Sequence, residues 1–80
     1  MTSADGAWDR AAAVASDLKP GTWESVETLA LLALAARDRP KDAALWCRAA
    51  EECAARLKPG GWASVRALAL LSMATRATPG

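Results

Sequence analysis

Apolar residues recur at helical spacing in four segments of the chain, and turn-forming residues separate these segments. In the first segment, Trp8, Ala11 and Ala15 fall on one face of a helix. The helices are predicted at about residues 4–18, 23–37, 40–57 and 62–75. Lys-Pro-Gly sequences follow the first and third segments, and both proline and glycine interrupt a helix. The pattern therefore predicts an all-α fold.

The second half of the chain repeats the first half, without a gap, at a distance of 39 residues. The segment LKPGTWESV at 18–26 returns as LKPGGWASV at 57–65. A period in this range is typical of helical units that stack and bury their apolar faces against each other. We therefore expect a single domain, 1–80, of two tandem helical hairpins that form a short α-solenoid or a four-helix bundle. Repeat 1 is predicted at about 4–37 and repeat 2 at about 40–76, and 77–80 is predicted to be a frayed tail.

The two helices that begin at a tryptophan are apolar on nearly every side. Residues 29–36 include no polar side chain, and 67–74 include only Ser72. Such a helix is usually buried all round, but the two alanine-rich helices are too small to cover both. We therefore expect another molecule to cover part of this surface, and self-association is the simplest case. The predicted contact residues are Trp23, Glu27, Leu31 and Leu34 in the first copy, and Trp62, Arg66, Leu70 and Met73 in the second.

Trp23 and Trp62 occupy the same position of the repeat, at the start of a helix. A tryptophan there is expected to pack the Pro-Gly connector against the core. The alternative is an exposed aromatic anchor, because tryptophan is enriched at the centres of protein interfaces.

Charge is reversed between the copies at two equivalent positions. Asp17 corresponds to Arg56, and Glu27 corresponds to Arg66. If the copies stack side by side, each pair lies at one level on adjacent helices. The alternative is that all four are solvated surface residues, in pairs worth about 0–1 kcal/mol.

The net charge of +1 is unevenly distributed. Residues 1–39 contain six acidic and four basic side chains, a net −2, and 40–80 contain six basic and three acidic ones, a net +3. Neither half has the dense basic stripe of a nucleic-acid-binding protein. The uncharged run 28–36 has nine residues, far fewer than a bilayer-spanning helix needs. We therefore expect neither nucleic acid nor membrane as a partner.

The chain contains little of the chemistry that catalysis needs. It has no histidine, the usual general base near neutral pH and the commonest metal ligand. Cys47 and Cys53 point about 120° apart on one predicted helix, so they cannot pair with each other. They are expected to be small buried residues; the alternative is a nucleophile activated by Arg48 or Arg56. We predict no enzyme, no metal and no cofactor, and a cytoplasmic protein of bacterial composition.

The spacing of small and bulky residues resembles that of tetratricopeptide repeats. Ala4, Trp8 and Ala11 match the second helix of that repeat. The other matching groups are Ala43, Cys47 and Ala50; Val26, Leu29, Ala30 and Ala33; and Val65, Leu68, Ala69 and Ser72. The resemblance implies that Trp23–Leu57 forms a hairpin and that the inner helices line a concave face holding a peptide or a partner helix. HEAT repeats, with a period nearer 39, are the second interpretation, and an unrelated duplicated four-helix bundle is the third.

These observations predict a non-enzymatic interaction or oligomerisation module that binds a partner protein or peptide through its inner helices. One alternative is a self-assembling structural repeat protein, stacked head to tail or as a homodimer. The other is a binder of small hydrophobic ligands, or an enzyme that depends on Cys47 or Cys53.

Overall fold

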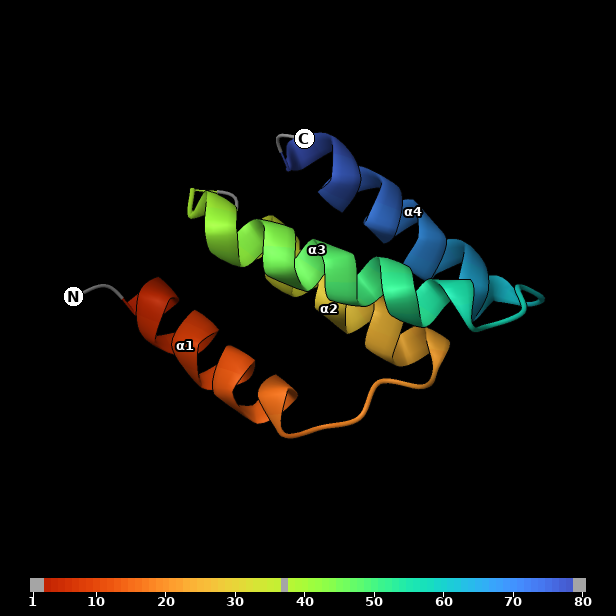
Figure 1. The fold of residues 1–80 in the computed structure, drawn as a ribbon, viewed down its shortest axis with the longest axis horizontal. Coiled ribbons are helices and arrows are strands. Elements are labelled where there is room, and N and C mark those ends of the chain that lie inside the picture. The colour runs from red at the N-terminus through yellow and green to blue at the C-terminus, as the bar shows by residue number, and fades with distance from the viewer. Residues whose placement is uncertain (1–2, 37, 79–80) are drawn as a thin grey trace.

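The computed structural model describes residues 3–36 and 38–78, which form four α-helices and no strand (Figure 1). They are α1 (Ser3–Ser16), α2 (Trp23–Ala35), α3 (Pro40–Ala55) and α4 (Trp62–Ala77). The all-α prediction is confirmed, and the predicted starts at Trp23, Pro40 and Trp62 are correct.

The predicted helix ends are off by about two residues. Both α1 and α3 end earlier, because their last residues close tighter turns: the amide of Leu18 bonds to the carbonyl of Ala15, and that of Leu57 to Ala54. By contrast, α4 continues through Ala77, about two residues past its predicted end. Residue 37 and residues 79–80, at the predicted ends of repeat 1 and of the tail, lie outside the described residues.

The two helices that begin at a tryptophan, α2 and α4, which we call the inner helices, start with the same serine-based cap. Before α2, the Ser25 hydroxyl accepts from the amides of Gly21 and Thr22, and the Thr22 hydroxyl accepts from the amide of Ser25. Before α4, Ser64 accepts from the amides of Gly60 and Gly61 in the same way. Gly61 has no side chain that could accept from the amide of Ser64, so the cap of α4 has only the hydrogen bonds to the Ser64 hydroxyl. Satisfying these otherwise unpaired amides fixes where each helix begins.

The central element of the fold is α2. It packs extensively against α3 and α4, whereas α1 touches it lightly and α3 touches α4 over a small area (Figure 1). The main hairpin is therefore α2–α3, as expected for Trp23–Leu57, and α4 lies against the same central helix. The units that are duplicated in sequence, α1–α2 and α3–α4, are not the units that pack most closely.

The hydrophobic core is built around α2, because its apolar residues face three neighbouring helices. Figure 1 shows α3 in front of α2, with α4 and α1 on opposite sides. The core consists of Val26, Leu29, Ala30, Leu32 and Ala33 from α2, Trp46, Cys47, Ala50 and Cys53 from α3, and Ala67 and Ala74 from α4. The prediction that a helix apolar on all sides is buried holds for most of α2.

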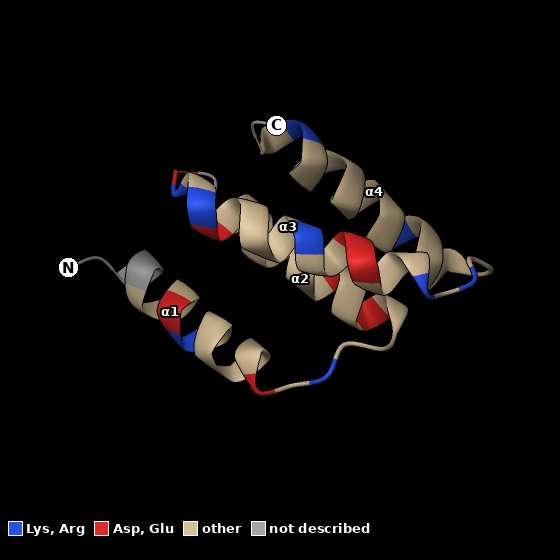
Figure 2. Ribbon diagram, in the orientation of Figure 1, with Lys and Arg blue, Asp and Glu red and all other residues tan. Residues whose placement is uncertain are grey.

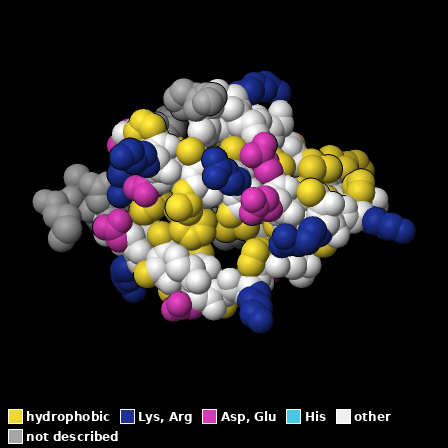
Figure 3. All heavy atoms as spheres, viewed as in Figure 1, with side chains coloured by type: hydrophobic (Ala, Val, Ile, Leu, Met, Phe, Trp, Pro, Cys, Tyr) yellow, Lys and Arg dark blue, Asp and Glu magenta, His cyan; other side chains and the backbone are white. Residues whose placement is uncertain are grey.

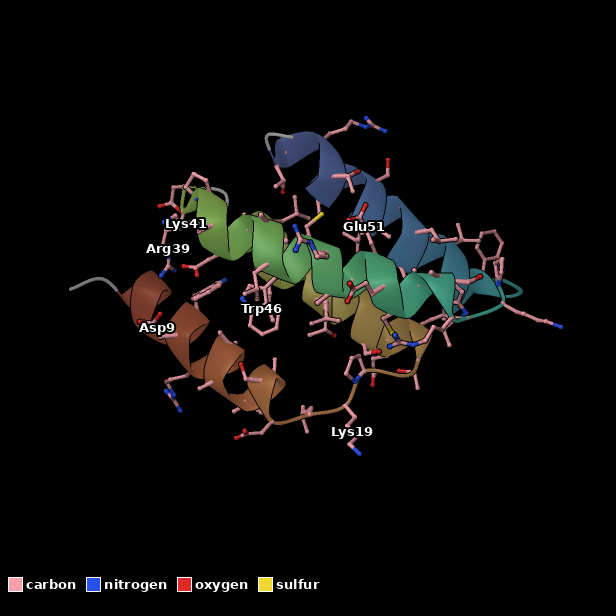
Figure 4. The ribbon with its side chains drawn as sticks, viewed as in Figure 1. Asp9, Lys19, Arg39, Lys41, Trp46 and Glu51 are labelled. Atoms are coloured by element: carbon pink, nitrogen blue, oxygen red, sulfur yellow. The ribbon has the colours of Figure 1, made fainter. Side chains whose placement is uncertain are left out.

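In the described part of α1, Trp8 and Asp9 make the specific polar contacts that hold this helix. The Trp8 indole Nε1 donates to the carbonyl of Leu32 at 3.0 Å. The Arg39 guanidinium lies 4.2 Å from the Trp8 ring centre, a cation–π contact, and 3.6 Å from the Asp9 carboxylate. Figure 4 shows Arg39 reaching toward Asp9, and Trp46 on the side of α3 that faces α1.

Within the described ranges, no helix is both long and apolar enough to cross a bilayer.

Candidate interaction surface on the last helix

The outer face of α4, which we define as Trp62, Val65, Leu68, Ala69 and Met73, is apolar and exposed. Trp62 is 87% exposed and Val65 is 53% exposed. Because a helix turns about 100° per residue, Trp62 and Met73 point in nearly the same direction. Apolar side chains gather at the end of the molecule where α4 begins (Figure 3). A continuous apolar face of this kind usually marks an interaction site.

The structure explains this face through the duplication. Three residues of the outer face correspond to buried residues of α2, and the other two, Trp62 and Met73, correspond to half-buried ones. Val26 is fully buried and its equivalent Val65 is not; Leu29 is 6% exposed and Leu68 is 39% exposed; Ala30 is buried and Ala69 is exposed. The second copy therefore presents to solvent the pattern that the first copy uses as core.

Among the predicted contact residues, those at the start of α2 have structural partners within the chain. The Trp23 indole Nε1 donates to the carbonyl of Lys58 at 3.0 Å, which ties the α3–α4 connector to α2. Glu27 is half-buried, and its Oε2 lies 2.9 Å from the Nε of Arg66. The expectation that a tryptophan packs a Pro-Gly connector against the core holds for Trp23, although the connector that it contacts is the one before α4 and not the one before its own helix. It is wrong for Trp62, which projects into solvent.

The remaining predicted contact residues are divided between the surface and the edge of the core. Leu31 and Met73 are exposed, whereas Leu34 and Leu70 are half-buried against the core. The structure brings Trp62, Arg66 and Met73 together along α4. It leaves Leu31 on a different surface, on α2. The prediction omitted Val65, Leu68 and Ala69, because in the repeat register they occupy core positions.

Charged side chains border this apolar face but do not interrupt it. Figure 2 shows acidic and basic residues along α3 and few along α4. The predicted pairing at one level is confirmed for Glu27 and Arg66. For Asp17 and Arg56 it is wrong: both are exposed, and no ion pair joins them. The alternative of solvated residues applies to that pair.

Both cysteines are free and buried. Burial raises the pKa of the Cys47 thiol above its ordinary value, and the negative charge of Glu51 raises it further, while a hydrogen bond with Thr78 acts in the opposite direction. The Cys53 sulfur lies 3.5 Å from the Ser25 hydroxyl. A buried thiol with a raised pKa is a poor nucleophile, so the geometry favours a packing role for Cys47.

A pocket of about 290 Å³ lies between the end of α1 and the start of α2. Figure 3 shows a hollow in this part of the molecule, and Figure 4 shows Lys19 pointing away from it. Its volume is at the small end of the range for ligand sites, about 300–1,000 Å³. The pocket is lined by Ala15, Leu18, Lys19, Pro20, Thr22, Glu24, Ser25, Thr28 and Leu29.

In the described part of the chain, no group of three or more cysteine, aspartate or glutamate side chains is arranged to hold a metal ion. Comparison with protein-family models, with curated proteins and with solved structures gives no match for this chain.

Proposed function

We propose that this chain is a non-enzymatic interaction module that binds a protein or peptide through the outer face of α4. The observation that carries the proposal is the contrast between equivalent residues: Val26 and Leu29 are buried on α2, whereas Val65 and Leu68 are exposed on α4. Burying apolar surface contributes about 25 cal/mol per Å². An uncovered copy of a core-forming face is therefore a favourable place for a partner to bind.

The composition of the face supports this proposal. Trp62 combines a large apolar ring with one hydrogen-bond donor, and tryptophan and methionine are both enriched in protein interfaces. Arg66 lies at its border, where a charged group adds orientation and specificity more than affinity. In this proposal Trp62, Arg66 and Met73 touch the partner, and Leu70 supports them from the edge of the core.

The predicted residues on α2 have a different part in the proposal. Trp23, Glu27 and Leu34 hold α4 and its connector in place, and Leu31 lies on a second exposed surface. The likeness to tetratricopeptide repeats supports binding by the inner helices. Both cysteines being free is consistent with the proposed reducing, cytoplasmic setting.

Photo-crosslinking in living cells tests the proposal directly. A photoreactive amino acid replaces Val65 in one variant and Leu45 in a matched control. Leu45 is similarly exposed but lies on the charged face of α3. We expect a covalent protein adduct from position 65, little or none from position 45, and loss of the adduct when Leu68→Asp is added. Equal labelling from both positions, or no adduct from position 65, would overturn the proposal.

A further inference from the structure

One hydrogen bond of the first copy has no counterpart in the second. Trp23 reaches the carbonyl of Lys58, in the connector before α4, at 3.0 Å. Trp62 occupies the same position of the second copy, at the start of α4. In the described residues no group accepts a hydrogen bond from Trp62, and its ring is 87% exposed. The second copy thus presents a donor without an acceptor.

The first copy presents the complementary feature. Lys19 is the repeat equivalent of Lys58, and in the described residues no indole bonds to its carbonyl. The pocket of about 290 Å³ lies beside this residue. Lys19 corresponds to Lys58, whose carbonyl accepts the hydrogen bond from Trp23. A tryptophan from a preceding unit, stacked in the same register, would therefore lie at this pocket.

A second surface, at the other end of the molecule, is exposed for the same reason. On α1, Val14 is 60% exposed and Ala11 is also exposed, whereas their equivalents on α3, Cys53 and Ala50, are buried against α2. On α2, Thr28 and Ala35 are exposed, whereas their equivalents on α4 are buried. We define the head surface as Ala7, Ala11 and Val14 of α1 with Thr28, Leu31 and Ala35 of α2.

The charges of the two copies fit the same arrangement. Within the chain, Glu27 and Arg66 form an ion pair at 2.9 Å. A second molecule stacked in the repeat register places its Glu27 beside Arg66 of the first. Because the sign of the charge is reversed between the two copies, these side chains attract each other. Arginine has five N–H donors, and the Nε is the one that contacts Glu27 within the chain. Arg66 can therefore bridge an acidic residue on each side.

We propose that the outer face of α4 binds the head surface of a second copy of this chain, head to tail, in the register of the internal repeat. Trp62 enters the pocket beside Lys19 of the second copy and donates to its carbonyl, and Arg66 pairs with its Glu27. This inference rests on the proposed function and names the partner. An interface between two different surfaces leaves one of each free at the ends, so assembly continues to filaments or closes into a ring.

Sedimentation equilibrium of the wild-type chain over a wide concentration range is the first test. We expect the average mass to rise above the 8.3 kDa of one chain and to pass twice that value as concentration increases. A chain that stays at 8.3 kDa up to millimolar concentration contradicts the inference. If position 65 still crosslinks to another protein, the proposed function stands and only the identity of the partner is wrong.

A matched pair of variants separates head-to-tail assembly from a symmetric dimer. Val65→Asp blocks the outer face of α4, and Val14→Asp blocks the head surface. Both sites are exposed, so folding should persist, as circular dichroism can verify. Each variant alone should associate at least about tenfold more weakly, because a carboxylate in an apolar contact lacks a partner. The exposed Leu45→Asp control should assemble like the wild type.

Mixing the two variants gives the decisive result. Each keeps one intact surface, so an equimolar mixture should form a dimer of one copy of each and stop there. If Val14→Asp alone still self-associates, α4 pairs with α4 and the head-to-tail register is wrong. If the mixture stays monomeric although the wild type assembles, the two surfaces do not bind each other.

Charge reversal tests the register itself. Arg66→Glu removes the attraction within the chain and between chains, and should weaken assembly several-fold. The double variant Glu27→Arg with Arg66→Glu restores opposite charges in both places and should recover assembly. Failure of the double variant to recover, with its helical content unchanged, would place Arg66 away from Glu27 of the second copy.

Discussion

The helices α2 and α4 have nearly the same pattern of apolar residues but different surroundings. Neighbouring helices cover most of α2, and its Val26, Leu29 and Ala30 form the centre of the core. One side of α4 is covered, and the equivalent residues on its other side face solvent. An apolar pattern therefore specifies which residues of a helix can pack against a neighbour. Whether those residues are buried depends on which helices lie beside it.

The helices α1 and α3 show the same asymmetry at the opposite end. Ala50 and Cys53 of α3 are buried on α2, but Ala11 and Val14 of α1 are exposed. The residue that fixes α1 is Trp8, for which α3 has Cys47. Packing in this molecule is directional: α2 is covered by the two helices that follow it, α3 and α4, whereas the outer face of α4 faces solvent. The molecule therefore has two unlike, unsatisfied ends.

The largest expected effect comes from placing a charge at equivalent positions of the two inner helices. Ala30→Asp buries an unpaired carboxylate in the core of a small domain, whose stability is only about 3–5 kcal/mol. We expect it to unfold the chain at 25 °C, whereas Ala69→Asp should leave the helical circular dichroism signal intact. Equal losses of signal would mean that α4 is covered within the single chain.

Removing leucine side chains should give a graded version of the same contrast. Leu29→Ala leaves a cavity in the core and should lower the free energy of unfolding by about 2–5 kcal/mol. Leu68→Ala removes a partly exposed side chain and should cost less than about 1 kcal/mol in dilute solution. Urea denaturation measures both values. Costs that become similar at high protein concentration would indicate that Leu68 is buried by association.

The two tryptophans should differ by about one hydrogen bond. Trp23→Phe removes the donor to the carbonyl of Lys58 and should cost about 0.5–1.5 kcal/mol, together with some loss of packing. Trp62→Phe should leave the stability of the monomer unchanged, because its indole has no acceptor in the described residues. Thermal unfolding of dilute samples tests this prediction. A destabilised Trp62→Phe monomer would contradict the exposed position of the ring.

The smallest effect concerns Cys47, whose surroundings include the end of α4. Burial and Glu51 raise the pKa of this thiol, so the folded state retains its proton at higher pH than the unfolded state. The resulting stability is complete below the ordinary thiol pKa of 9.0 and is lost as the pH rises through the higher pKa of the folded state. Urea titrations should show this loss in the wild type but not in Cys47→Ala. Glu51→Gln should reduce it, because one cause of the shift is removed.

The sequence was sufficient to predict the four helices, and to predict that part of the apolar surface of α2 and α4 stays uncovered within the chain. The apolar periodicity and the Pro-Gly breaks predicted four helices, and three of the predicted helix starts are correct. The reversed charges predicted the Glu27–Arg66 ion pair. Exposed contact residues were predicted at Trp62 and Met73, since too few residues were available to cover both inner helices. Val65 and Leu68 were not predicted, because they repeat the apolar pattern of Val26 and Leu29 and nothing in the local sequence distinguishes the covered copy from the exposed one.

The sequence by itself determined which segments are helical and which positions can form an interface, because apolar periodicity and Pro-Gly stops act locally. Only the tertiary structure decided which copy of each apolar pattern became core. Coverage depends on neighbours in space: the Trp23 indole donates to the carbonyl of Lys58, whereas the Trp62 indole has no acceptor among the described residues. Two nearly identical segments therefore became a buried helix and an exposed surface.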